Sequence, residues 1–147
     1  MYRNSEGYAD PTAAAAFSNI GREQAQERRA WRRKKTMVAA RPKVYVVSPF
    51  AGDIVYNVKQ ARKYCRYAVG HNRIPIASHL LFTQFLNDKD PKERELGLLC
   101  GLALLKCCAE VWVFGTERSQ GMKKELEEAK RLGKTIRYFT VEMEEVA

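Results

Sequence analysis

Residues 110–139 read EVWVFGTERSQGMKKELEEAKRLGKTIRYF and hold one complete unit of the predicted fold. A short apolar run stops at Gly115 and predicts a buried strand. After a polar loop, a charged segment with helical spacing ends at Gly133, and a second strand-like run follows. A strand, a helix and a further strand in this order predict a right-handed crossover and a parallel sheet.

The same alternation continues toward the N-terminus. Residues 43–48 and 74–78 are short runs that predict two more strands, and Pro75 places the second at a sheet edge or at a strand start. Residues 54–70 have helical apolar spacing, and residues 79–86 predict a short helix. The predicted fold class is therefore α/β: a flavodoxin- or Rossmann-like parallel sheet of about four to five strands, sandwiched by helices.

Another helix is predicted in residues 90–108. Asp90 and Pro91 are typical of an N-cap and a first turn. From Leu96 onward the segment is apolar on most sides, which predicts a central packed helix.

Residues 1–42 are predicted to form a basic helical extension with a linker, and residues 43–147 the α/β domain. Asp10 is a plausible N-cap for a helix, or a helix pair interrupted near Gly21, that runs to about Lys35. Residues 40–42 are interpreted as the linker.

The net charge of +9 is uneven along the chain. Residues 1–42 hold nine basic and four acidic residues, and most of the excess lies in RRAWRRKK, Arg28–Lys35. This run is either a solvated helix end or a contact for nucleic-acid phosphates, with Trp31 available for stacking.

The longest apolar run, Leu96–Leu105, is too short to span a bilayer, and the first ten residues are too polar for a signal peptide. A cytoplasmic protein without a membrane partner is the expectation.

The cysteines are spaced poorly for a metal site. None forms a CxxC pair, and only His71 and His79 could join them as ligands. Buried, reduced thiols are predicted instead, and no metal or cofactor is expected. The four cysteines are Cys65, Cys100, Cys107 and Cys108.

Ligands of open α/β sheets bind at the carboxyl ends of the strands. The loops expected there begin at Ser48, Ser78 and Gly115. Ser119 either caps the helix or holds a phosphate oxygen, and Gly121 lets a ligand approach the backbone.

Three further residues are ambiguous from spacing alone. Glu125 flanks the apolar face of its helix, and on spacing alone it would be one surface charge among several. The hydroxyl of Tyr45 needs a partner if it is buried, and a carboxylate at this edge would supply one. His79 is either a surface residue or a polar wall of the pocket. The candidate ligand-binding residues are Ser48, Phe50, His79, Ser119, Gly121 and Met122.

Residues 43–141 resemble the nucleoside 2-deoxyribosyltransferase-like superfamily, including the 2'-deoxynucleoside 5'-phosphate N-hydrolases. The likeness rests on VYVVSPF, LLKCCAEVWVFG and above all SQGMKKELEEAKRLGK. Small uncharacterised members from bacteria, phages and mobile elements are the most similar. The resemblance implies a small-molecule nucleoside or nucleotide ligand and a homo-oligomer.

The resemblance also implies roles for individual residues. Glu125 would be the nucleophile or charge stabiliser at the anomeric carbon, and Tyr45 would orient it. Ser119 would contact a 5'-phosphate, and His79 would lie in the pocket.

The sequence departs from the family at two positions. The aspartate that manages the proton of the departing base aligns with Gly101, and a second common aspartate aligns with Ala109. Since glycine has no acid–base chemistry, another group must substitute, or the protein binds a nucleotide or an ADP-ribose-type signal without efficient cleavage. Substitutes by loop position are His79, Asp88 and Glu95.

Overall fold

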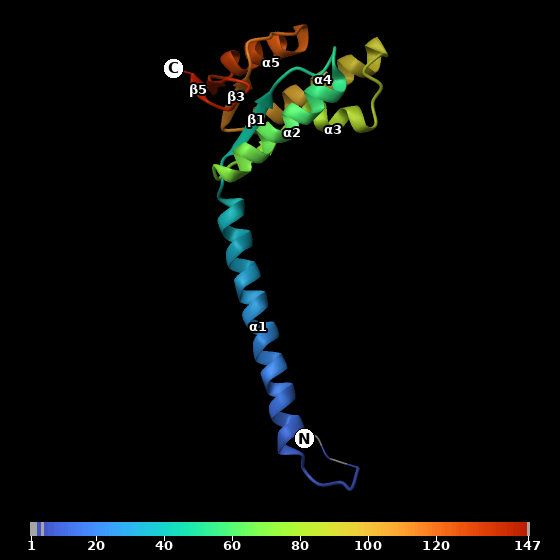
Figure 1. The fold of residues 1–147 in the computed structure, drawn as a ribbon, viewed down its shortest axis with the longest axis vertical. Helices are drawn as coiled ribbons and strands as arrows, with labels where there is room; N and C mark the ends of the chain where they lie inside the picture. Colours follow the sequence, from blue (N-terminus) through green and yellow to red (C-terminus); the bar gives the residue numbers. More distant parts are fainter. Residues whose placement is uncertain (1–2, 4, 147) are drawn as a thin grey trace. The chain divides into compact units, whose positions relative to one another are not determined.

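The computed structural model describes Arg3 and residues 5–146, and the chain divides into two compact units, one up to Ala40 and one from Arg41. The main element of the first unit is helix α1 (Pro11–Ala39), drawn in blue to teal in Figure 1. The side chain of Asp10 caps it by accepting hydrogen bonds from the backbone N–H groups of Thr12 and Ala13. None of its residues is buried. No helix in the described part of the chain is long and apolar enough to cross a membrane.

Helix α1 runs without a break through Gly21, so of the two predicted alternatives the structure has the single helix and not the interrupted pair; the predicted end near Lys35 is wrong, because the helix ends at Ala39. One glycine in a helix interior costs only about 1 kcal/mol relative to alanine. The Gln-, Glu-, Arg- and Ala-rich sequence around Gly21 offsets that cost because these residues favour helix.

The second unit contains a five-stranded sheet with strand order β2-β1-β3-β4-β5. The strands are β1 (Lys43–Val47), β2 (Ile74–Ile76), β3 (Glu110–Phe114), β4 (Thr135–Phe139) and β5 (Glu145–Val146). The first four are parallel, and β5 pairs antiparallel with β4. The predicted α/β class with a mainly parallel sheet is confirmed, and β2, which contains Pro75, lies at an edge.

Helices cover both faces of this sheet (Figure 1). They are α2 (Ile54–Gly70), α3 (Ser78–Leu81), which continues into the 3-10 helix η1 (Phe82–Gln84), α4 (Pro91–Lys106) and α5 (Gln120–Arg131). On one face, Tyr45 and Val47 pack with Leu105 of α4 and Leu126 of α5. On the other, Tyr64 of α2 stacks on Phe114, with ring centroids 4.2 Å apart.

Helix α4 is not the central packed helix that its apolar sequence predicts. Only Gly101 and Leu105 are buried, while Leu96 and Leu99 are about half exposed. Helix α4 forms part of an outer layer, so only one side of it meets the sheet. The cysteine prediction is wrong for Cys107, which follows the last turn of α4 and is exposed; of the four thiols, only Cys108 is fully buried.

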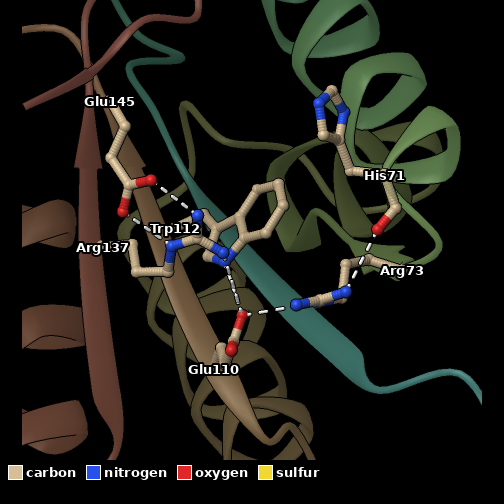
Figure 2. A network of polar contacts seen from close by, with 6 residues as sticks. All are labelled: His71, Arg73, Glu110, Trp112, Arg137 and Glu145. Atoms are coloured by element: carbon tan, nitrogen blue, oxygen red, sulfur yellow. Dashed lines mark hydrogen bonds and ion pairs between the residues drawn. The ribbon is translucent and has the colours of Figure 1, made fainter.

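A polar network crosses the sheet at the start of β3 (Figure 2). Glu110 Oε2 accepts a hydrogen bond from the Trp112 indole N–H at 2.8 Å and one from Arg73 Nε at 3.5 Å. Arg137 lies 3.8 Å from the same carboxylate oxygen and donates two hydrogen bonds to Glu145 of β5. The network thereby joins side chains from β3, β4, β5 and a residue near the start of β2. It lies at the end of β3 opposite the loop that follows this strand.

Candidate functional site

A cavity of about 480 Å³ opens where β1, β2 and β3 end. Its wall comes from the loop after β1, from α3 and η1, from the first half of α4, and from the start of α5. Seven predicted site residues line it: Ser48, Phe50, His79, Ser119, Gly121, Met122 and Glu125. Segments far apart in the sequence meet here because parallel strands present their carboxyl ends at one edge.

Glu125 is the buried acid of this cavity, with 8% of its surface exposed. It lies on the inner face of α5 with Met122, Leu126 and Ala129, all of which pack on the sheet. Sequence spacing places Glu125 at the border of this apolar face. In the folded protein Glu125 is buried, because the face of α5 that meets the sheet and α4 is wide enough to include this residue.

Tyr45 anchors one oxygen of the Glu125 carboxylate. The Tyr45 hydroxyl donates a hydrogen bond to Glu125 Oε1 at 2.8 Å, which is the kind of partner expected for a buried tyrosine. Within the described residues, no donor forms a hydrogen bond with Oε2, whereas every fully buried side-chain nitrogen or oxygen has a hydrogen-bond partner. Oε2 is therefore the oxygen that stays open to the cavity.

Ser78 completes a cluster of three hydroxyl and carboxyl groups. Its Oγ lies 2.7 Å from the Tyr45 hydroxyl and 3.4 Å from Glu125 Oε1. With Tyr45 donating to the carboxylate, the Ser78 hydroxyl donates to the tyrosine oxygen or, at the longer distance, to Glu125. Sequence reasoning named the loop that contains Ser78 but selected His79. The available signal was a serine two residues after a strand, at the carboxyl edge of the sheet.

Burial and hydrogen bonding act on the pKa of Glu125 in opposite directions. Loss of hydration disfavours the charged form, while hydrogen bonds from Tyr45 and Ser78 favour it. Burial dominates and raises the pKa of Glu125 to about 7. Burial and the nearby carboxylate also raise the pKa of Tyr45 above its ordinary value, so its hydroxyl stays neutral and able to donate.

Gly101 of α4 lies directly against this cluster. A Cβ atom at this position would be 2.7 Å from the Tyr45 hydroxyl oxygen and 2.9 Å from Ser78 Oγ. Tyr45 and Ser78 therefore fill the space that a larger side chain would need. An aspartate at position 101 does not fit the present arrangement of Tyr45 and Ser78.

His79 and Ser48 form a second polar pair in the cavity wall. His79 Nε2 lies 2.9 Å from Ser48 Oγ. Burial lowers the pKa of His79 to about 4, so the imidazole is neutral near pH 7. A neutral imidazole paired with a hydroxyl can orient a polar ligand group, but it does not act as a charged acid at that pH.

The start of α5 offers hydrogen-bond donors to the same cavity. Ser119 Oγ caps the helix by accepting from Met122 N at 3.2 Å. Gln120 and Gly121 line the cavity, and no acceptor from the described residues takes their backbone N–H groups. Free N–H groups at a helix start favour anions. Lys124 and Arg94 add two cationic side chains to the lining.

Residues 42–139, about two-thirds of the chain, match the family model described as domain of unknown function DUF7768. The chain belongs to the DUF7768 family. Comparison with curated protein sequences found no match. Among solved structures, a 2-deoxyribosyltransferase from Bacillus psychrosaccharolyticus, described as a biocatalyst for nucleoside synthesis, has a TM-score of 0.52 and 19% sequence identity. The match covers 67% of this chain and 72% of that chain. At this identity the likeness establishes a shared deoxyribosyltransferase-like fold.

The DUF7768 cavity also contains the groups considered as substitutes for the missing aspartate. His79, Asp88 and Glu95 all line it. Asp88 lies 4.0 Å from Arg94 in an ion pair, whereas Glu95 is exposed. Among the described residues of this DUF7768 protein, no three metal-binding side chains cluster in a way that could hold an ion.

Proposed function

We propose that the cavity binds a nucleoside or nucleotide and that Glu125 attacks its anomeric carbon to cleave or transfer the N-glycosidic bond. The observation that carries this proposal is the anchored carboxylate: Tyr45 holds Oε1, and Oε2 stays open to the cavity. A cavity of about 480 Å³ is of a size typical of small-molecule sites.

The chemistry requires an ionised carboxylate at the sugar. As the bond from the anomeric carbon to the base nitrogen breaks, the base leaves with the electron pair and takes up a proton. Oε2 of Glu125 forms a bond to the anomeric carbon, or stabilises its positive charge, as carboxylates do in retaining glycosidases. Water or a second base then takes the place of Glu125 and releases a proton.

The start of α5 is proposed to hold a 5'-phosphate when the ligand carries one. The N–H groups of Gln120 and Gly121 and the nearby Lys124 support an anion at this end of the cavity. Ser119 would add a hydroxyl contact. Binding there would place the sugar against Glu125, which is five residues further along the helix.

The least supported step of an enzymatic function is the protonation of the departing base. Gly101 cannot supply it, and His79 is neutral near pH 7. Loss of a positioned acid typically lowers a rate on the order of 10²–10⁴-fold. This favours a second candidate function, in which the protein binds a nucleotide or an ADP-ribose-type signal without cleaving it.

Measuring the release of free base from a panel of ligands distinguishes the catalytic function from the binding function. Deoxynucleoside monophosphates, nucleosides and NAD-type compounds are incubated with the protein, and free base is followed by chromatography. Release by the wild type and by Glu127→Gln, but not by Glu125→Gln, supports catalysis; Glu127 is an exposed residue on the same helix. Absence of release, with a rise in melting temperature for one ligand, contradicts catalysis and favours the binding function.

We also propose a homo-oligomer. Leu81, Phe85, Leu96 and Leu99 are large apolar side chains on and around α3, η1 and α4 that remain about half exposed or more. A second copy that covers them would remove this apolar surface from water. Sedimentation of the wild type should give a mass above that of one chain, and Leu99→Glu should lower it; a monomeric wild type would contradict the proposal.

A further inference from the structure

Two helices carry the entire net charge of this protein. Helix α1 holds seven basic and two acidic residues, and α2 holds four basic and no acidic residues. The rest of the chain holds 15 basic and 15 acidic residues, so it contributes nothing to the net charge of +9. Such a separation of charge creates local positive potential that overall composition does not reveal.

The basic residues of α2 form one outward stripe: Lys59, Arg62, Lys63 and Arg66. Positions three and four apart lie on the same side of a helix. All four are exposed, while Ala61, Tyr64 and Ala68 on the opposite side are buried against the sheet. Within the described residues, none of the four side chains forms an ion pair.

Helix α1 also separates its charges. At roughly 100° per residue, one half of its circumference contains six of its seven basic residues. These are Arg22, Arg28, Arg29, Arg32, Arg33 and Lys35. Glu23 and Glu27 fall in the other half, together with Trp31, which is 69% exposed.

We propose that the basic face of α1 and the outward basic face of α2 are contact surfaces for the phosphate backbone of nucleic acid. Rows of exposed, unpaired cations match a polyanion, and arginine is well suited to phosphate oxygens. A membrane-surface helix would need an apolar face for the lipid. The apolar face of α2 is used in the core, and that of α1 is interrupted by Glu23 and Glu27. The proposal is independent of the chemistry in the cavity.

Salt-dependent binding of a labelled DNA duplex and of its single strand, measured by fluorescence anisotropy on the full chain, tests this. One variant replaces Lys59, Arg62, Lys63 and Arg66 with Gln, and a second replaces Arg28, Arg29, Arg32 and Arg33 with Gln. A matched control replaces Lys89, Lys106, Lys123 and Lys130 with Gln, four exposed cations elsewhere. The control has the same net charge as each variant, so the three differ only in where the charge was removed. Circular dichroism verifies that all three are folded.

The expected result is wild-type affinity that falls steeply with salt. Each of the two variants should bind about tenfold or more weakly, with a log–log salt slope less steep by roughly 0.9 for each duplex phosphate that the protein no longer neutralises. The control should bind like the wild type. Equal weakening of control and variants, or no binding by the wild type, would overturn the proposal. Tighter binding to vesicles of anionic lipid than to either DNA would also overturn it, in favour of a membrane surface.

Discussion

The hydroxyl of Tyr45 and the carboxylate of Glu125 form the most specific contact in the cavity, because it joins β1 to α5 through two buried side chains. The hydrogen bond stabilises the ionised carboxylate and so opposes the effect of burial on its pKa. The balance places the pKa of Glu125 at about 7, where small changes alter its charge near neutral pH.

Tyr45→Phe should raise the pKa of Glu125 above about 7, because it removes a donor that favours the charged form. The ring stays buried, so the loss of stability should be about 1 kcal/mol. Carbon-13 NMR titration of the Glu125 carboxyl measures the shift without requiring activity. Tyr56→Phe, at a half-exposed tyrosine, should leave the titration unchanged. An unaltered midpoint in Tyr45→Phe would show that this hydrogen bond does not control the charge.

The raised pKa of Glu125 predicts a pH-dependent stability. The folded protein holds the proton up to about pH 7, while the unfolded chain loses it near 4.5. Between these values the folded state binds more protons, so the free energy of unfolding contributed by Glu125 falls as pH rises. The free energy of unfolding of the wild type minus that of Glu125→Gln should decrease by on the order of 3 kcal/mol as the pH rises through this window.

Urea unfolding of both proteins at several pH values measures that difference, and the contribution of His79 cancels in the comparison. Glu127→Gln serves as the control and should follow the wild-type profile, since Glu127 is exposed. A wild-type minus Glu125→Gln difference that does not vary with pH would contradict an elevated pKa.

Gly101→Ala should destabilise the protein by about 1–3 kcal/mol, because the new methyl group overpacks a filled site. Its Cβ would lie 2.7 Å from the Tyr45 hydroxyl oxygen, and the buried ring has little freedom to move. Gly97→Ala on the same helix is the matched control. The nearest atom to its new Cβ, on Leu86, is at an ordinary 3.6 Å, so stability should be unchanged or slightly higher. Thermal melting of both variants tests this, and equal stability would contradict it.

At the scale of secondary-structure elements, Glu110 joins the strands at the end of the sheet away from the cavity (Figure 2). Glu110→Ala should lower stability on the order of 2 kcal/mol, because Trp112 and Arg73 lose their acceptor and Arg137 a nearby charge. Glu145→Ala removes only an exposed partner of Arg137 and should have a much smaller effect. Urea unfolding compares the two, and a larger loss in Glu145→Ala would place the stabilising contact at the sheet edge instead.

Element boundaries were predictable where the signal was local. Asp10, Asp90 and Ser119 cap helices as their residue types predict, because capping depends on a few neighbouring atoms. Helix α4 was mispredicted as central because apolar content does not tell which side meets the sheet. The continuity of α1 was left open by the sequence, because a single glycine is only a weak helix breaker.

At the scale of the whole molecule, the unit from Arg41 should fold without α1. No residue of α1 is buried, so its removal takes no side chain out of the core. A protein lacking residues 1–40 should therefore have the melting temperature of the full chain, measured by circular dichroism at a wavelength and buffer common to both. A clear drop in melting temperature would show that α1 stabilises the α/β unit. The same truncated protein should lose part of its affinity for DNA.

The sequence by itself determined the α/β class, the strand–helix order and the candidate residues, because periodicity, caps and short motifs are properties of neighbours along the chain. Only the tertiary structure decided that Glu125 is buried, that Ser78 joins Tyr45, and that the hydroxyl groups of Tyr45 and Ser78 fill the space beside Gly101. It also decided that the cations of α2 face outward as one stripe. These features depend on which helix faces meet the sheet, and that is set by packing between residues far apart in sequence.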